Sequence, residues 1–129
     1  MNNQLELLRL AKTAAQRAYA PYSNFHVGAA VLSDSGNVYQ GCNVENVSYP
    51  VGTCAEESAI AAMVCAGDTK IAEILIYADS EELITPCGAC RQRISEFAGS
   101  KTKVHLANSS GIQKTLTANV LLPDAFKEF

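Results

Sequence analysis

Three cysteines and one glutamate have the residue types and spacing of a hydrolytic metal site. Cys87 and Cys90 form a C-x-x-C pair, Cys54 lies earlier in the chain, and Glu56 follows it by two residues. Three thiolates leave a tetrahedral zinc one ligand short, and an open fourth position distinguishes a catalytic zinc from a structural one. A carboxylate beside that position can exchange protons with a zinc-bound water. The pattern therefore predicts hydrolysis at zinc, with Glu56 as the proton carrier.

A C-x-x-C pair alone is ambiguous, because it also occurs in redox dithiols and in structural zinc sites. A structural site made of four cysteines would need Cys42 or Cys65 as its fourth ligand. Cys65 lies eleven residues beyond Cys54, about 16 Å along a helix that rises 1.5 Å per residue. We therefore interpret Cys42 and Cys65 as small buried hydrophobes. A non-catalytic zinc or redox dithiol module remains the alternative from another functional class.

The elements that must position these residues follow from hydrophobic periodicity and from Gly and Pro punctuation. Helices are expected at 3–19, 55–66, 87–97 and 117–122, and strands at 27–32, 38–44, 71–78 and 104–107. The first two strands are expected to form an antiparallel hairpin, and Thr53 is the expected N-cap of the second helix. The alternation of strands with helices favours parallel pairing and an αβα sandwich, an α/β fold.

Both cysteine clusters fall at predicted helix N-termini. Unpaired N–H groups and the positive end of the helix dipole stabilise thiolates there. Cys87 and Cys90 are three positions apart on one helical turn, so they face the same point in space. We therefore expect the two helix N-termini to converge on one metal ion.

Bulk properties narrow the class of protein. The 129 residues fit a single domain, 1–129, and the net charge of −3 without a basic run argues against a nucleic-acid partner. No signal-peptide pattern and no membrane-spanning apolar run occurs, so we expect a cytoplasmic protein without a membrane partner. Five cysteines in such a chain favour metal binding or catalysis over a disulfide framework.

Five segments together resemble the small homotetrameric cytidine deaminases over nearly the whole chain. These are Tyr22-Ser23-Asn24-Phe25-His26-Val27-Gly28-Ala29-Ala30, Gly41-Cys42-Asn43-Val44-Glu45-Asn46, Thr53-Cys54-Ala55-Glu56, Pro86-Cys87-Gly88-Ala89-Cys90-Arg91-Gln92 and Leu121-Leu122-Pro123-Asp124-Ala125-Phe126. The resemblance implies a five-stranded mixed sheet inside the αβα sandwich, one Zn²⁺ per subunit, and a homotetramer whose active sites are completed by neighbouring subunits. It further implies hydrolytic deamination of cytidine and deoxycytidine to uridine and deoxyuridine, a reaction of pyrimidine salvage.

The resemblance also implies a role for each matching residue. Cys54, Cys87 and Cys90 match the zinc ligands and Glu56 the proton shuttle. The residues that match the substrate contacts are Asn43 and Glu45 for the ribose hydroxyls, Phe25 for the face of the pyrimidine, the backbone of Ala55 and Thr85 for its edge, and Tyr49 and Phe126 for contacts across a subunit interface. An amide and a carboxylate suit the ribose, because both accept hydrogen bonds from a hydroxyl.

One residue departs from the pattern. Family members commonly carry Arg directly after the Cys-Ala-Glu glutamate, where it offsets the thiolate charge, but this chain has Glu57. Glu57 lies about 100° around a helix from Glu56, which allows it to face solvent. Arg91, next to Cys90, is then the candidate for charge compensation. The departure leaves open a zinc deaminase of another aminated nucleoside or heterocycle, although Asn43 and Glu45 favour a ribosyl group.

Overall fold

A five-stranded sheet forms the centre of the molecule. The computed structural model describes residues 3–128 and orders the strands β2-β1-β3-β4-β5. Their bounds are β1 Val27–Ser33, β2 Val38–Cys42, β3 Ile71–Ala78, β4 Ala98–Asn108 and β5 Gly111–Thr117. The β3–β4 pair is parallel, whereas β1–β2, β1–β3 and β4–β5 are antiparallel. The expected hairpin and mixed sheet are confirmed, but the parallel pairing that strand–helix alternation favours is found at β3–β4 alone among the described strands.

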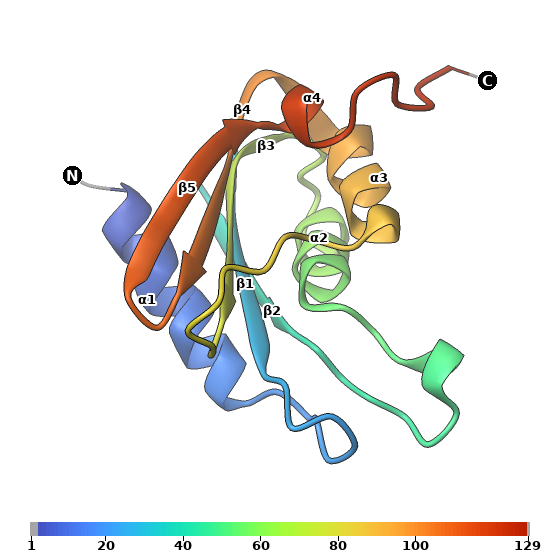
Figure 1. The fold of residues 1–129 in the computed structure, drawn as a ribbon. Coiled ribbons are helices and arrows are strands. Elements are labelled where there is room, and N and C mark those ends of the chain that lie inside the picture. The colour runs from blue at the N-terminus through green and yellow to red at the C-terminus, as the bar shows by residue number, and fades with distance from the viewer. Residues whose placement is uncertain (1–2, 129) are drawn as a thin grey trace.

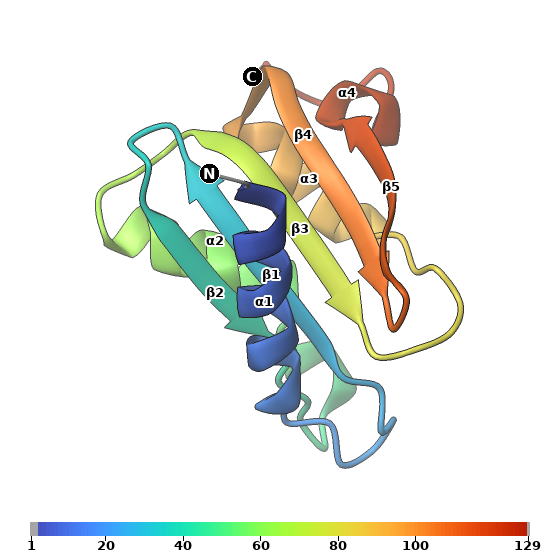
Figure 2. The same cartoon turned by 90° about the vertical axis from the view of Figure 1, so that its left-hand side faces the viewer.

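Helices cover both faces of this sheet. Helix α1 (Asn3–Gln16) lies on one face, and α2 (Ala55–Cys65), α3 (Gly88–Phe97) and the short α4 (Ala118–Leu121) lie on the other (Figures 1 and 2). The expected three-layer αβα sandwich is therefore confirmed. No helix within residues 3–128 has the length and apolar character needed to span a bilayer.

Alternation along the central strands produces two hydrophobic cores. On β3, Leu75 packs with Leu7 of α1, whereas Ile74 faces the opposite core with Ile94 of α3. Successive strand residues point to opposite faces of a sheet, so a strand covered on both sides has a continuous apolar sequence. The run at 71–78 is such a strand, and this sequence-based expectation is confirmed.

Two glycines allow helices to approach the hairpin closely. A Cβ at Gly28 would lie 1.9 Å from the carbonyl oxygen of Ala11 in α1. A Cβ at Gly41 would lie 2.3 Å from the backbone nitrogen of Ala59 and 2.5 Å from the carbonyl oxygen of Ala55 in α2. Helix α2 therefore rests directly on the backbone of β2.

Several expected boundaries of helices and strands were wrong. β4 begins at Ala98 rather than at 104, because its first residues are small or polar. β5 was not expected, because it is an edge strand rich in polar residues. Helix α1 ends at Gln16 rather than at 19. The N-cap of α2 is Cys54 and not Thr53, so the cysteine itself occupies the junction between extended chain and helix.

Candidate active site

The three predicted ligands meet where α2 and α3 begin. The sulfur atoms of Cys54, Cys87 and Cys90 all lie within 4.8 Å of one another. Cys54 and Cys87 are the N-caps of α2 and α3, and Cys90 follows in the first turn of α3. A tetrahedral zinc with Zn–S bonds of about 2.3 Å holds its sulfurs about 3.8 Å apart. The donor set and its spacing therefore fit Zn²⁺.

Without a bound cation, the surroundings of the cluster oppose ionisation of Cys54 and Cys90. Burial raises the pKa of Cys90, and the nearby Glu56 carboxylate raises it further. Burial also raises the pKa of Cys54. Partial burial opposes ionisation of Cys87 as well, but hydrogen bonds from the backbone N–H of Cys90 and from the neighbouring thiols lower its pKa. A coordinated metal reverses this balance, because it deprotonates its thiol ligands outright.

Glu56 is a buried carboxylate beside the sulfurs. It is the second residue of α2 and its exposed fraction is 5%. Burial raises its pKa, which a hydrogen bond from the backbone N–H of Glu56 itself and the positive charge of Arg93 partly oppose. A carboxyl group whose pKa lies above its usual value can both accept and release a proton near neutral pH.

The other two cysteines stand apart from the metal cluster. Cys42 is half-buried and Cys65 is exposed, and neither belongs to the group of sulfurs that could share one ion. The expectation that they are not ligands therefore holds. The expectation that Cys65 is buried is wrong, because it lies at the end of α2, where the helix leaves the sheet.

A cavity of about 400 Å³ adjoins the cluster. Its lining residues are Tyr22, Ser23, Asn43, Val44, Glu45, Asn46, Tyr49, Gly52, Thr53 and Cys54. It thus connects the predicted ribose residues Asn43 and Glu45 to one predicted zinc ligand, Cys54. Phe25, Ala55, Glu56, Thr85 and Phe126 are not among its lining residues in the described chain.

Asn43 and Glu45 are held in place by backbone groups. The side chain of Asn43 accepts a hydrogen bond from the N–H of Val27 at 2.9 Å and donates one to the carbonyl of Phe25 at 2.8 Å. Glu45 accepts hydrogen bonds from the N–H groups of Tyr22 and Ser23, at 3.0 and 3.1 Å, and from the Ser23 hydroxyl. The Ser23 hydroxyl is the main cause that lowers the pKa of Glu45. The loop before β1 and the end of β2 therefore form one connected unit.

The remaining predicted contact residues are more exposed. Phe25 is half-buried directly before β1, and Thr85 is exposed in the loop that precedes α3. Tyr49 is 73% exposed and its ring centroid lies 5.8 Å from that of Tyr22. Phe126 is 67% exposed, and its carbonyl accepts a hydrogen bond from Gln92 of α3 at 2.8 Å.

The hydrogen bonds of Arg91, the predicted charge-compensating residue, lead to the loop before α3 and not to a sulfur. Its Nε donates to the carbonyl of Pro86 at 2.9 Å and a terminal nitrogen donates to Thr85 Oγ1 at 3.2 Å. The guanidinium near the cluster is that of Arg93, which donates to Cys90 Sγ at 3.5 Å. Consecutive helical residues are about 100° apart, whereas residues three apart share a face. The spacing from Cys90 was the signal that could have identified Arg93.

The side chain of Glu57 does not face solvent alone, because both of its carboxylate oxygens have partners in the protein. Its Oε1 accepts a hydrogen bond from the backbone N–H of Cys54 at 3.2 Å. Its Oε2 lies 3.3 Å from a terminal nitrogen of Arg93. Glu57, the residue that departs from the family pattern, is therefore ion-paired with Arg93 of α3.

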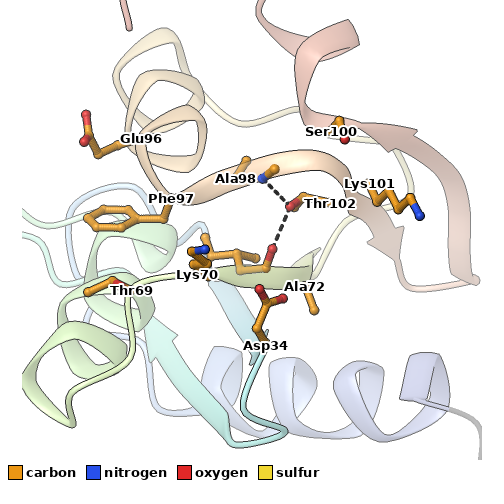
Figure 3. Close-up of a pocket in the computed structure, with 12 residues that line it drawn as sticks. Asp34, Thr69, Lys70, Ala72, Glu96, Phe97, Ala98, Ser100, Lys101 and Thr102 are labelled. Carbon is orange, nitrogen blue, oxygen red and sulfur yellow. Dashed lines mark hydrogen bonds between the residues drawn. The ribbon is translucent and has the colours of Figure 1, made fainter. Parts of the chain in front are cut away.

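A second cavity, of about 620 Å³, lies at the opposite end of the sheet (Figure 3). Its walls include Asp34, Lys70, Ile71, Phe97 and Ala98, at the end where β1 finishes and β3 and β4 begin. The predicted site residues lie where β1 begins and β2 ends. No predicted site residue lines this second cavity.

Comparisons with known proteins agree with this geometry. Residues 1–106 match the model of the cytidine and deoxycytidylate deaminase zinc-binding region. The chain is 42% identical to a cytidine deaminase of Sporosarcina psychrophila over 123 residues, 95% of this chain and 90% of that protein. It is 41% identical to a cytidine deaminase of Halalkalibacterium halodurans over 126 residues, 98% and 95% of the two chains.

Solved structures show the same relationship. The crystal structure of cytidine deaminase from Burkholderia pseudomallei superposes with a TM-score of 0.91 at 43% identity, covering 98% of this chain and 100% of that one. Cytidine deaminase from Mycobacterium tuberculosis superposes with a TM-score of 0.84 at 37% identity, covering 99% and 100%. Sequence, fold and cysteine cluster agree: the chain belongs to the zinc-binding cytidine and deoxycytidylate deaminase family.

Proposed function

We propose that the protein is a zinc-dependent cytidine deaminase that converts cytidine and deoxycytidine into uridine and deoxyuridine. The observation that carries this proposal is buried Glu56, two residues after Cys54, beside three sulfurs that fit a zinc ion. Three sulfur ligands leave a coordination position for reaction chemistry, and a buried carboxyl group is suited to proton transfer. Neither a redox dithiol nor a closed structural zinc site accounts for that carboxyl group.

Zinc held by Cys54, Cys87 and Cys90 supplies the Lewis acidity that makes water nucleophilic near neutral pH. Glu56 accepts the proton of the attacking water and passes it to N3 of the cytosine ring. It then takes the remaining proton of the new hydroxyl on C4 and delivers it to the departing amine. A C4–O bond forms, the C4–N4 bond breaks, and one water is exchanged for one ammonia, so the reaction is balanced without a redox partner.

The residues assigned to the substrate are proposed from their match to the family and from their placement. Asn43 and Glu45 border the cavity that reaches Cys54, and a carboxylate has enough lone pairs to accept from a sugar hydroxyl in addition to its backbone donors. Phe25 is fixed by Asn43 and would pack on the pyrimidine face. The N–H of Ala55, at the first turn of α2, and the carbonyl of Thr85 would read the pyrimidine edge.

We further infer a homotetramer in which Tyr49 and Phe126 reach a neighbouring site. Both aromatic side chains are largely exposed in one subunit, which suits residues that become buried on assembly. A single domain spanning 1–129, a cytoplasmic location and a role in pyrimidine salvage complete the proposal. Sedimentation of the zinc-loaded protein tests the assembly, and a monomer at assay concentration would remove the roles of Tyr49 and Phe126.

The proposed activity is tested by following the absorbance change of cytidine on zinc-loaded protein. Deoxycytidine, free cytosine and CMP are assayed in parallel. Faster turnover of cytidine and deoxycytidine than of free cytosine and CMP supports the proposal. Turnover of another aminated heterocycle, with none of cytidine or deoxycytidine, would replace it. Glu56→Gln should lower kcat by at least 10²- to 10⁴-fold, roughly the range of general acid–base catalysis, while the protein retains zinc. Full activity of that variant would reject the role of Glu56.

A further inference from the structure

Arg93 and Glu57 each follow a predicted zinc ligand by three residues. Glu57 is three residues after Cys54 on α2, and Arg93 is three residues after Cys90 on α3. Residues three apart lie on one face of a helix, so both side chains project toward the sulfurs. They meet there, with Arg93 Nη2 3.3 Å from Glu57 Oε2. The ion pair thus joins α2 to α3 at the metal cluster.

The charge of the site explains why a cation is needed at this point. Three thiolates around Zn²⁺ leave a net charge of −1, and Glu56 adds a further carboxylate in a buried position. Excess negative charge reduces the ability of zinc to acidify water. Arg93 is the guanidinium that contacts a ligand sulfur, through Nη1 to Cys90 Sγ at 3.5 Å. Hydrogen bonding to the sulfur draws electron density from the thiolate, and the full charge of the guanidinium offsets the site.

We propose that Arg93 is the positioning residue that supplies the compensating charge of this zinc site, and that Glu57 orients it against Cys90. The Glu57 carboxylate on α2 holds this guanidinium of α3 beside Cys90. The inference rests on the proposed function in assuming that the three cysteines bind zinc, but not on the identity of the substrate.

Glu57 contributes orientation in two ways. Its Oε1 accepts the backbone N–H of Cys54, so the carboxylate is fixed relative to the first ligand. Its Oε2 then forms an ion pair with Nη2 of Arg93, while Nη1 of the same planar guanidinium donates to Cys90 Sγ. Both side chains are 36% exposed, so the attraction between them is partly screened by solvent. The ion pair therefore serves to orient the guanidinium of Arg93 more than to stabilise the fold.

The test measures zinc affinity by competition with a chromophoric chelator, which requires no nucleoside. Arg93→Gln should weaken zinc binding by about 10- to 100-fold, the usual range for residues that support a metal ligand. Arg93→Lys, which keeps the charge, should lose less. The double variant Glu57→Arg/Arg93→Gln returns the guanidinium to α2 and should recover most of the lost affinity. Arg9→Gln, which removes an ion-paired guanidinium on α1, is the matched control and should bind zinc normally.

A purely structural ion pair is distinguished by two further readouts. In Co²⁺-loaded protein, Arg93→Gln should shift the sulfur-to-cobalt charge-transfer band, because the thiolate of Cys90 loses its donor. Glu57→Gln should shift that band less, because Arg93 is still present. Equal losses of zinc affinity in Arg93→Gln and Glu57→Gln with an unmoved band would overturn the proposal. So would wild-type zinc affinity in Arg93→Gln. If the effects on metal binding are observed but cytidine is not turned over, the proposed function fails and the proposal about Arg93 stands.

Discussion

The side-chain amide of Asn43 donates a hydrogen bond to the backbone carbonyl of Phe25 at 2.8 Å, tying the end of β2 to the segment before β1. The same side chain accepts a hydrogen bond from the backbone N–H of Val27, so Asn43 fixes both ends of the segment 25–27. Asn43 thus has a structural task besides the proposed contact with ribose.

Asn43→Asp keeps an oxygen that can accept from Val27 but loses the donor to Phe25. We expect a loss of about 1–3 kcal/mol in the free energy of unfolding, the usual cost of leaving a partner unsatisfied. A rise of tenfold or more in KM for cytidine should accompany it, because the aromatic ring is no longer fixed. Urea unfolding and steady-state kinetics measure the two effects. Asn119→Asp, on the exposed side of α4, serves as control; equal kinetics in both variants would contradict the assignment.

Removal of zinc should lower stability as well as activity. A ligand that binds the folded state alone adds about 2.7 kcal/mol when it is present at 100 times its Kd. Treatment with a chelator should therefore lower Tm and abolish turnover, and added Zn²⁺ should restore both. Cys87→Ala should reproduce the loss permanently. Cys65→Ala changes an exposed cysteine outside the cluster and should keep wild-type Tm and turnover until the chelator is added. The same permanent loss in Cys65→Ala as in Cys87→Ala would contradict the assignment of the cluster as the metal site.

Asp68 should make the protein sensitive to acid. Its Oδ2 accepts hydrogen bonds from Ser33, Ser35, Asn37 and Tyr39, which lower its pKa from 3.8 to about 2. Because the folded-state pKa is depressed, this contribution to stability is fully present above pH 4 and is lost as the pH falls toward 2. Asp68→Asn should be less stable at pH 7 and should lose less stability across that window. Urea midpoints from pH 7 to pH 2 measure this difference, with Asp124→Asn as control; parallel curves for wild type and Asp68→Asn would refute it.

Gly41→Ala should disturb the site through α2. The added Cβ would approach Ala59 and Ala55 to within 2.5 Å, so the helix must move away from β2. Overpacking of this kind costs about 1–3 kcal/mol. Since α2 carries Cys54 and Glu56, kcat should fall even in the folded fraction. Gly99→Ala has open space around it and should change neither thermal unfolding nor kcat; an equal effect in both variants would show that the close approach is unimportant.

The parts of this protein that could be predicted from sequence are those fixed by short-range periodicity. Cys87 and Cys90 share a helical face by their spacing alone, and the apolar run at 71–78 has one way to be buried on two sides. β5 could not be predicted in this way, because an edge strand with polar residues has little apolar alternation. The resemblance to the family, rather than local pattern, supplied the fifth strand.

Side-chain partners between distant segments were the part that sequence could not supply. Adjacency to Cys90 suggested Arg91, but helix geometry turns that residue toward Pro86 and brings Arg93 to the sulfur instead. The partner of Arg93 is on another helix, so no spacing within one segment indicates it. The backbone donors that hold Glu45 come from residues more than twenty positions earlier and depend on how the loop before β1 folds.

The unequal burial of the three sulfurs has a kinetic consequence. Cys87 is exposed, Cys54 is half-buried and Cys90 is fully buried. A competing chelator replaces metal ligands one at a time from the solvent side, so we expect Cys87 to be displaced first and Cys90 last. The slow event in metal exchange is then release from buried Cys90, which requires a local opening at the start of α3 and not melting of the whole domain. Zinc should accordingly exchange on a shorter timescale than the one on which the sheet unfolds.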